Sequence, residues 1–136
     1  MVFAISTDAQ VPNSDSFQVF ALNFKALYKI RMDVSLIQIQ AAPYTIIDSF
    51  KCRNLLMKVN DYAKKMEKNN NTMVNFNPNQ MDLRLLLFFF SKNDTAIVAL
   101  TFTGRYFRLN NRVYRYDQDL LDTLGETLPN IKDYFE

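Results

Sequence analysis

The chain has 136 residues, a formal net charge of +2, no histidine, no tryptophan and a single cysteine. This length favours one domain, and a hydrophobic fraction of 49% with a charged fraction of 22% excludes a disordered or collagen-like chain. Without histidine there is no Ser-His-Asp or Cys-His nucleophile and no histidine-ligated zinc, and one thiol cannot close an internal disulfide.

The N-terminal half of the sequence predicts two helices separated by a strand, after a short strand at 2–6. Apolar residues then recur at steps of three and four behind a run of capping residues, which predicts an amphipathic helix over about 16–30. From Met32 the period becomes two, which predicts a strand that ends at Pro43. A longer amphipathic helix is expected over about 45–68.

The C-terminal half predicts a β-meander over 72–116, followed by a short helix. Segment 83–90 is apolar on both faces, which is typical of a central strand covered by helices. Asp117 is expected to cap the short helix and Gly125 to end it, before a final turn. The strands expected in the meander are 72–76, 81–91, 95–103, 105–109 and 112–116.

This order of elements predicts an α+β fold, in which a mostly antiparallel sheet carries its helices on one side. The two amphipathic helices, at about 16–30 and 45–68, are expected to pack on the sheet together with the short C-terminal helix. We expect a single domain over 1–136, with 117–136 as an acidic helical tail.

The small net charge hides a strong segregation along the chain. Residues 1–50 carry a net charge of −1, residues 51–116 a net charge of +8, and residues 117–136 a net charge of −5. One interpretation is a basic surface that meets a polyanion, such as RNA, or an acidic protein partner. The alternative is that the acidic tail folds back onto the basic segment and neutralises it.

The predicted hairpin at 105–116 gathers aromatic and basic side chains on one face. With Asn110-Asn111 as its turn, Tyr106, Arg108 and Arg115 share that face with Val113. A ring beside two guanidinium groups suits a base and its phosphates, so these three are candidate ligand-binding or nucleic-acid-binding residues. The alternative is an ordinary exposed face of a hairpin, where tyrosine and arginine are favoured.

Two further surfaces suggest a protein partner or a second copy of the chain. The apolar residues of the tail are candidates for partner binding, namely Leu128, Ile131, Tyr134 and Phe135. Self-association through an exposed strand edge is a separate hypothesis, because segment 83–90 is strongly apolar.

No complete catalytic constellation is found, so a non-enzymatic binding module is the leading hypothesis. Asp117, Asp119 and Asp122 are interpreted as residues of a helix start rather than as metal ligands, and Cys52 as a structural thiol. We expect no metal and no cofactor. No apolar run reaches the about 20 residues needed to span a bilayer, and no signal peptide is recognised, so we expect a soluble, intracellular chain with no membrane partner.

Short runs between residues 33 and 116 carry a family resemblance. They are Asp33-Val34-Ser35-Leu36, Tyr44-Thr45-Ile46-Ile47, the strand from Thr95 to Tyr106, and Val113-Tyr114-Arg115-Tyr116. Together they resemble the N-terminal β-rich portion of ribosome-inactivating proteins, the rRNA N-glycosidases. The resemblance implies that Tyr106 stacks on a target adenine. The family's catalytic Glu and Arg belong to a later region, so the alternative function is a truncated or split member without activity of its own.

Overall fold

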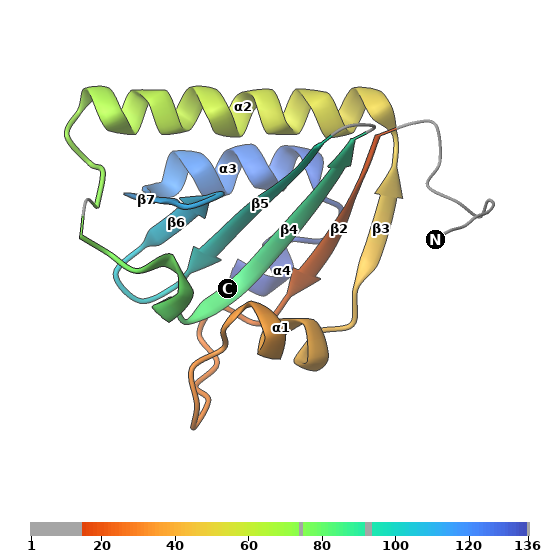
Figure 1. Cartoon of the computed structure of the whole chain (residues 1–136). Helices are drawn as coiled ribbons and strands as arrows, with labels where there is room; N and C mark the ends of the chain where they lie inside the picture. Colours follow the sequence, from red (N-terminus) through yellow and green to blue (C-terminus); the bar gives the residue numbers. More distant parts are fainter. Residues whose placement is uncertain (1–14, 74, 92–93, 136) are drawn as a thin grey trace.

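The computed structural model describes residues 15–73, 75–91 and 94–135, which fold around a six-stranded antiparallel sheet (Figure 1). In space the strands follow the order β3-β2-β4-β5-β6-β7. Because β2 lies between β3 and β4, the helix α2 carries the chain from the edge of the sheet across β2 to its centre. The strands are β2 (Ser16–Ala21), β3 (Tyr44–Ile47), β4 (Leu83–Ser91), β5 (Asp94–Thr101), β6 (Tyr106–Leu109) and β7 (Arg112–Arg115).

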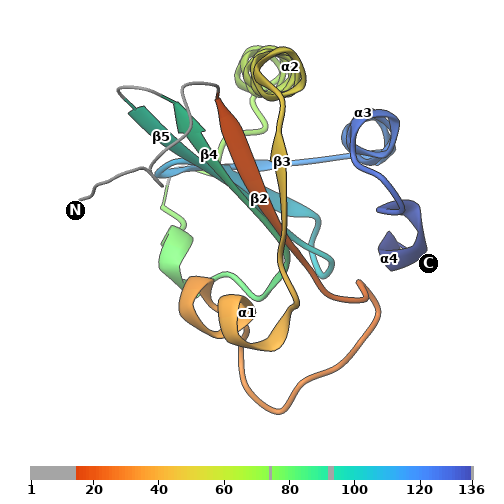
Figure 2. The same ribbon diagram turned by 90° about the vertical axis from the view of Figure 1, so that its right-hand side faces the viewer.

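Helices cover both faces of this sheet (Figure 2). On one face lie α2 (Ser49–Lys68), α3 (Gln118–Thr127) and the short α4 (Lys132–Phe135). On the other lie α1 (Val34–Gln40) and the single 3-10 turn η1 (Pro78–Gln80). The α+β class and the antiparallel sheet are confirmed, but the expectation that all helices share one side is wrong for α1.

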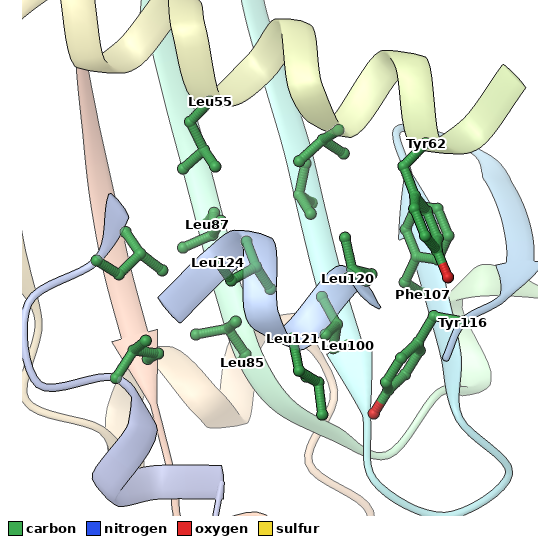
Figure 3. Close-up of a cluster of buried hydrophobic side chains, with 14 of the residues drawn as sticks. Leu55, Tyr62, Leu85, Leu87, Leu100, Phe107, Tyr116, Leu120, Leu121 and Leu124 are labelled. Carbon is green, nitrogen blue, oxygen red and sulfur yellow. The ribbon is translucent and has the colours of Figure 1, made fainter. Parts of the chain in front are cut away.

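The larger core lies between the sheet and the α2–α3 layer (Figure 3). Alternate residues of each strand point into it, as the two-residue period of a strand requires. Both helices contribute apolar residues at helical spacing, such as Leu55 and Val59 on α2 and Leu120 and Leu124 on α3. The smaller core on the opposite face holds Ile37 of α1 against Phe20 and Leu86 of the sheet.

The meander is confirmed for β4 to β7, and β4 is a central strand with β2 on one side and β5 on the other. Segment 83–90 is therefore paired along both edges and does not supply an exposed strand edge. Among the described residues of the strand expected at 72–76, an isolated bridge joins Thr72 to Tyr114. Backbone bonds at Met73 and Asn71 attach this bridge to the outer edge of β7.

The predicted helix at 16–30 is wrong, because residues 16–21 form the strand β2 and a loop follows. Phe17 and Val19 face the larger core, whereas Phe20 faces the smaller one. A strand buried on both faces places apolar residues at nearly every position, so helical spacing among its phenylalanines has no diagnostic value. Pairing with β3 and β4 then satisfies the backbone as a strand.

The predicted strand after Met32 is also wrong, because the chain forms α1 there. Asp33 caps this helix by accepting a hydrogen bond from the backbone N–H of Leu36 at 2.9 Å. Ile37 and Ala41, four residues apart, are buried together, whereas Ile39 is 74% exposed. In a strand Ile37 and Ile39 would share one face, so their different burial identifies the period as helical.

The long helix is confirmed over Ser49–Lys68, with Asp48 as its cap, whereas residues 44–47 form β3 instead of the first helical turn. The C-terminal helix is confirmed with Asp117 as its cap. Gly125 lies inside α3 and does not end it. The strand expected at 2–6 lies outside the residues that the structure describes.

Candidate functional site

The hairpin has the predicted pairing, with Tyr106 opposite Arg115 and Arg108 opposite Val113. Arg108 is nevertheless only 5% exposed. Its Nε donates to the backbone oxygen of Asn110 at 2.7 Å, so this side chain stabilises the turn. Burial also lowers the pKa of its guanidinium below the usual value. Arg108 is therefore a structural residue of the hairpin and does not present its charge to a ligand.

Tyr106 and Arg115 do lie together, although the ring already has neighbours. The Arg115 guanidinium lies 5.5 Å from the centre of the Tyr106 ring, and the Phe76 ring lies 4.9 Å from it. Arg115 is exposed and Tyr106 is partly buried. An incoming base would compete with Phe76 and Arg115 for contact with this ring.

The acidic tail folds back onto α2. Lys58 reaches Glu126 at 3.9 Å and Lys65 reaches Asp119 at 3.8 Å, both in exposed positions. These pairs neutralise part of the basic segment, as the second interpretation of the charge segregation expects. Because the tail packs on the α2 face, it does not cover Tyr106 and Val113, which face the α1 side.

The tail residues considered for partner binding differ in exposure. Leu128 and Ile131 are 2% and 1% exposed, so they belong to the core and cannot contact a partner in this fold. Phe135 packs against Phe24 with ring centres 4.7 Å apart. Tyr134 is 37% exposed and can still take part in an interface.

A cavity of about 450 Å³ opens where four separate segments meet. They are the chain just after β2, the β5–β6 turn, the end of β7 with the start of α3, and α4. Its apolar wall is built from Phe24, Phe102, Tyr116, Leu121 and Phe135. Three cations line it, namely Lys25, Arg105 and Lys132, with Gln118 and Asp122 as the other polar residues. We call this site the basic aromatic pocket.

The β5–β6 turn holds Arg105 in an unusual backbone conformation. Gly104 has a φ of 78° and Arg105 a φ of 52°, and the latter is uncommon for a residue with a side chain. The buried hydroxyl of Thr101 donates to the backbone oxygen of Thr103 at 2.9 Å and accepts from the N–H of Tyr106 at 3.1 Å. A Cβ at position 104 would lie 2.4 Å from the Tyr106 ring, so only glycine fits there.

Close packing also positions the other two cations. The backbone N–H of Phe24 donates to the carbonyl of Tyr134 at 2.7 Å, which fixes Lys25 beside α4. A Cβ at Gly125 would lie 2.7 Å from Cε of Lys132, so the absence of a side chain there lets the lysine stem lie against α3. Both lysines are exposed at the pocket.

The lining of the pocket carries three cations and one carboxylate, that of Asp122, and this net positive charge favours an anion. Among the residues that the structure describes, no carboxylate lies within ion-pair distance of Lys25, Arg105 or Lys132. Asp122 accepts a hydrogen bond from Gln118 at 3.1 Å. The Arg105 guanidinium lies 6.0 Å from the centre of the Tyr116 ring. Burial raises the pKa of Tyr116 to about 12, so its hydroxyl stays neutral and adds no negative charge at physiological pH.

Sequence reasoning missed this pocket because its residues come from four segments. The one signal available was Gly104 followed by a basic residue in a turn between strands. The sequence pattern predicts a helix that includes Phe24 and Lys25, and this helix does not form. Residues 24–25 reach α4 because β2 packs beside β4 in the sheet. No pattern along the sequence indicates this contact.

Cys52 is buried in α2, as expected of a structural thiol, and its Sγ lies 3.6 Å from the carbonyl of Ser16. Burial raises its pKa to about 11, the nearby Asp15 carboxylate adds to this, and Arg53 opposes it. Folding therefore keeps a proton on this thiol that the unfolded chain releases above about pH 9.

Alkylation of Cys52 by iodoacetamide at about pH 8 is expected to be at least about a hundredfold slower in the folded chain than in urea, because the thiolate is scarcer. The same raised pKa predicts that the free energy of unfolding falls as the pH rises from about 9 towards 11. Mass spectrometry of labelled protein measures the rates, with Cys52→Ser as the unreactive control. Equal rates in the folded and unfolded chains would contradict the prediction.

Within residues 15–73, 75–91 and 94–135, no group of three or more acidic or thiol side chains could hold a metal ion. The helices described there are all too short or too polar to cross a membrane. Comparison with known protein families, with curated proteins and with solved structures finds no match to this chain. The resemblance to ribosome-inactivating proteins stays a prediction.

Proposed function

We propose that this chain is a binding module, and that its ligand is a small anion carrying an apolar or aromatic group, held in the basic aromatic pocket. The observation that carries the proposal is the convergence of Lys25, Arg105 and Lys132 around one cavity, with no carboxylate paired to them among the described residues. Charge-assisted hydrogen bonds from such cations are the strong contacts of small-molecule sites.

The shape and walls of the pocket support the same ligand class. A volume of about 450 Å³ lies within the range of small-molecule sites. Phe102 and Phe135 offer ring surfaces to the apolar part of the ligand, and the three cations are available to bind the anionic group of the ligand. Phe24 packs against both rings, with ring centres 6.4 Å and 4.7 Å away, so the apolar wall is formed before a ligand arrives.

Phenyl phosphate is the probe that tests this proposal, since it combines one ring with one anionic group. Titration into ¹⁵N-labelled protein is expected to give saturable shifts of the backbone amides of Lys25, Phe102, Arg105 and Lys132. Benzyl alcohol, which lacks the charge, and inorganic phosphate, which lacks the ring, are expected to bind at least about tenfold more weakly.

Substitutions separate the pocket from the rest of the basic surface. Arg105→Gln is expected to weaken phenyl phosphate binding by about tenfold or more, equivalent to about 1.5–2 kcal/mol, because it removes a charged donor. Arg115→Gln is the matched control, since it removes the same charge from an exposed residue of the hairpin. Absence of saturable shifts, or an equal loss in both variants, would refute the proposal.

A second candidate is the hairpin face, which would bind RNA or an acidic protein partner. The specific observation in its favour is the exposed Arg115 guanidinium over the Tyr106 ring, an arrangement used in contacts to bases. The buried Arg108 weakens this candidate, because only one of its two expected cations is available. Titration with a short single-stranded RNA would support it if the shifts lay at 106 and 115 and vanished in Arg115→Gln.

A further inference from the structure

The loop between β2 and α1 exposes apolar side chains at its tip. Residues 25–31 read Lys-Ala-Leu-Tyr-Lys-Ile-Arg, and we call them the basic apolar loop. Leu27 is 94% exposed, Ile30 58% and Tyr28 37%. Both views show this segment extending away from the sheet, at the end of the molecule where α1 lies (Figures 1 and 2).

The base of this loop is firmly attached to the body of the protein. The buried Arg84 donates from Nε and Nη2 to the carbonyl of Ala26, at 3.2 Å and 2.8 Å. The same guanidinium lies 4.9 Å from the centre of the Tyr28 ring. At the far end, the N–H of Met32 donates to Oδ1 of Asp82 at 2.9 Å. The fold therefore holds Leu27 outward, although the exposure of leucine to water is unfavourable.

Basic residues alternate with the apolar ones. Lys25, Lys29 and Arg31 are all exposed, and no acidic residue lies between Ala21 and Met32. None of the three forms an ion pair with another residue of the described ranges. Asp82, at the base of the loop, is already paired with Arg84 at 2.9 Å. The tip therefore combines projecting apolar groups with three exposed positive charges, of which only Arg31 is influenced by the Asp82 carboxylate.

We propose that the basic apolar loop docks on an anionic lipid bilayer. Leu27 and Ile30 enter the boundary between headgroups and acyl chains, and Lys29 and Arg31 contact lipid phosphates and carboxylates. This combination of apolar insertion and electrostatic attraction is how peripheral proteins bind such surfaces. Tyr28 suits the headgroup level, because its ring is apolar and its hydroxyl is polar.

The shape of the loop favours a bilayer over a protein partner. A stable protein interface takes about 800 Å² from each side, which the tip of a seven-residue loop does not supply. A bilayer accommodates a convex tip without a matching groove, and about two apolar side chains with a few cations give reversible binding there. The sequence predicts no membrane partner because no apolar run is long enough to span a bilayer and no signal peptide is recognised. Docking through a loop at the bilayer surface needs neither feature.

Co-sedimentation with vesicles tests the proposal. The chain is expected to bind vesicles of phosphatidylcholine with about 30 mol% phosphatidylserine, to release them as salt rises, and to ignore pure phosphatidylcholine. The double variant Lys29→Glu/Arg31→Glu is expected to weaken binding by at least about 25-fold, at about fivefold for each cation lost. Lys51→Glu/Lys64→Glu, on the exposed side of α2, changes the net charge equally and is expected to bind much like the wild type.

A fluorescent reporter locates the contact, because the natural chain has no tryptophan. Leu27→Trp is expected to shift its emission to shorter wavelength on adding the anionic vesicles, since the ring leaves water. Met57→Trp, at an exposed position of α2, is expected to show no shift. Both sites are exposed, so neither change should unfold the chain.

Three results would overturn the proposal: no binding to the anionic vesicles, equal losses in the loop and α2 charge variants, or a Leu27→Trp emission unchanged by vesicles. Loop variants that lose a protein partner while binding vesicles as the wild type does would assign the loop to that partner instead. The proposal does not depend on the basic aromatic pocket. Lys25, which lines that pocket, is left unchanged in every variant, so phenyl phosphate binding should persist when vesicle binding is lost.

Discussion

Replacing Leu87 with alanine is expected to lower the free energy of unfolding by about 3 kcal/mol. Leu87 is fully buried in β4, between Val19 of β2 and Val98 of β5, and belongs to the cluster that includes Leu55 and Leu124 (Figure 3). Because β4 is paired with a strand on each side and helices pack above it, its neighbours cannot move in to fill the space that the lost atoms leave. The alanine variant therefore loses both the burial of the side chain and the contacts around the cavity.

Urea denaturation followed by circular dichroism measures this change, and thermal melting should fall by about 10 °C. Leu27→Ala is the matched control, because it makes the same chemical change at a residue that is 94% exposed. It is expected to alter the free energy of unfolding by less than about 0.5 kcal/mol. A Leu87→Ala variant as stable as this control would contradict the core assigned between the sheet and the α2–α3 layer.

Replacing Arg84 with methionine is expected to lower the free energy of unfolding by about 2–3 kcal/mol. The change preserves much of the side-chain volume but removes the donors that Arg84 supplies to the Ala26 carbonyl and to both oxygens of Asp82. The loss stays below that of a fully buried ion pair, because the Asp82 side chain is 44% exposed and water can solvate it.

The same variant is expected to loosen the basic apolar loop, since its attachment at Ala26 depends on Arg84. Hydrogen exchange of amides 25–31 should therefore accelerate more than exchange in β4. Arg112→Met is the matched control, because the Arg112–Glu67 pair is largely exposed and is screened by water. Exchange of the loop at the wild-type rate would contradict the anchoring role of Arg84.

The pH dependence of Asp82 gives an independent measure of the Arg84 contact. Burial raises the pKa of this carboxyl, but hydrogen bonds from Arg84 and the Met32 N–H, with the charges of Arg84 and Arg31, bring the pKa below its usual value. A lowered pKa stabilises the fold above the unfolded pKa, and this stability is lost as the pH falls through the folded value. In Arg84→Met the pKa of Asp82 should rise towards its unfolded value. The free energy of unfolding should therefore fall less when Asp82 is protonated in acid.

The basic aromatic pocket and the basic apolar loop lie next to each other in the chain, and Phe24 and Lys25 connect them. Phe24 contributes to the wall of the pocket, while Lys25 belongs to both surfaces. Their proximity follows from β2, which ends at Ala21 and delivers the next residues to α4 on one side and to the loop on the other. The two proposals remain separable, because the pocket depends on Arg105 and the docking of the loop on Leu27 and Ile30.

The local signals in the sequence determined the long helix, the meander and the C-terminal helix. Each of them depends on contacts between residues close in the chain, such as the cap at Asp117 and the asparagine turn at 110–111. The pairing of the hairpin was predictable for the same reason, since a two-residue turn fixes its register.

Only the tertiary structure decided whether residues 16–21 form a helix or a strand, on which face of the sheet α1 packs, and which residues line the pocket. A segment buried on both faces has no periodicity that separates helix from strand, so β2 forms because β3 and β4 offer it hydrogen bonds from both sides. The burial of Arg108 and Leu128 likewise depends on what packs over them. Charge and exposure at a site are properties of the whole fold, whereas caps and turns are properties of a few neighbouring residues.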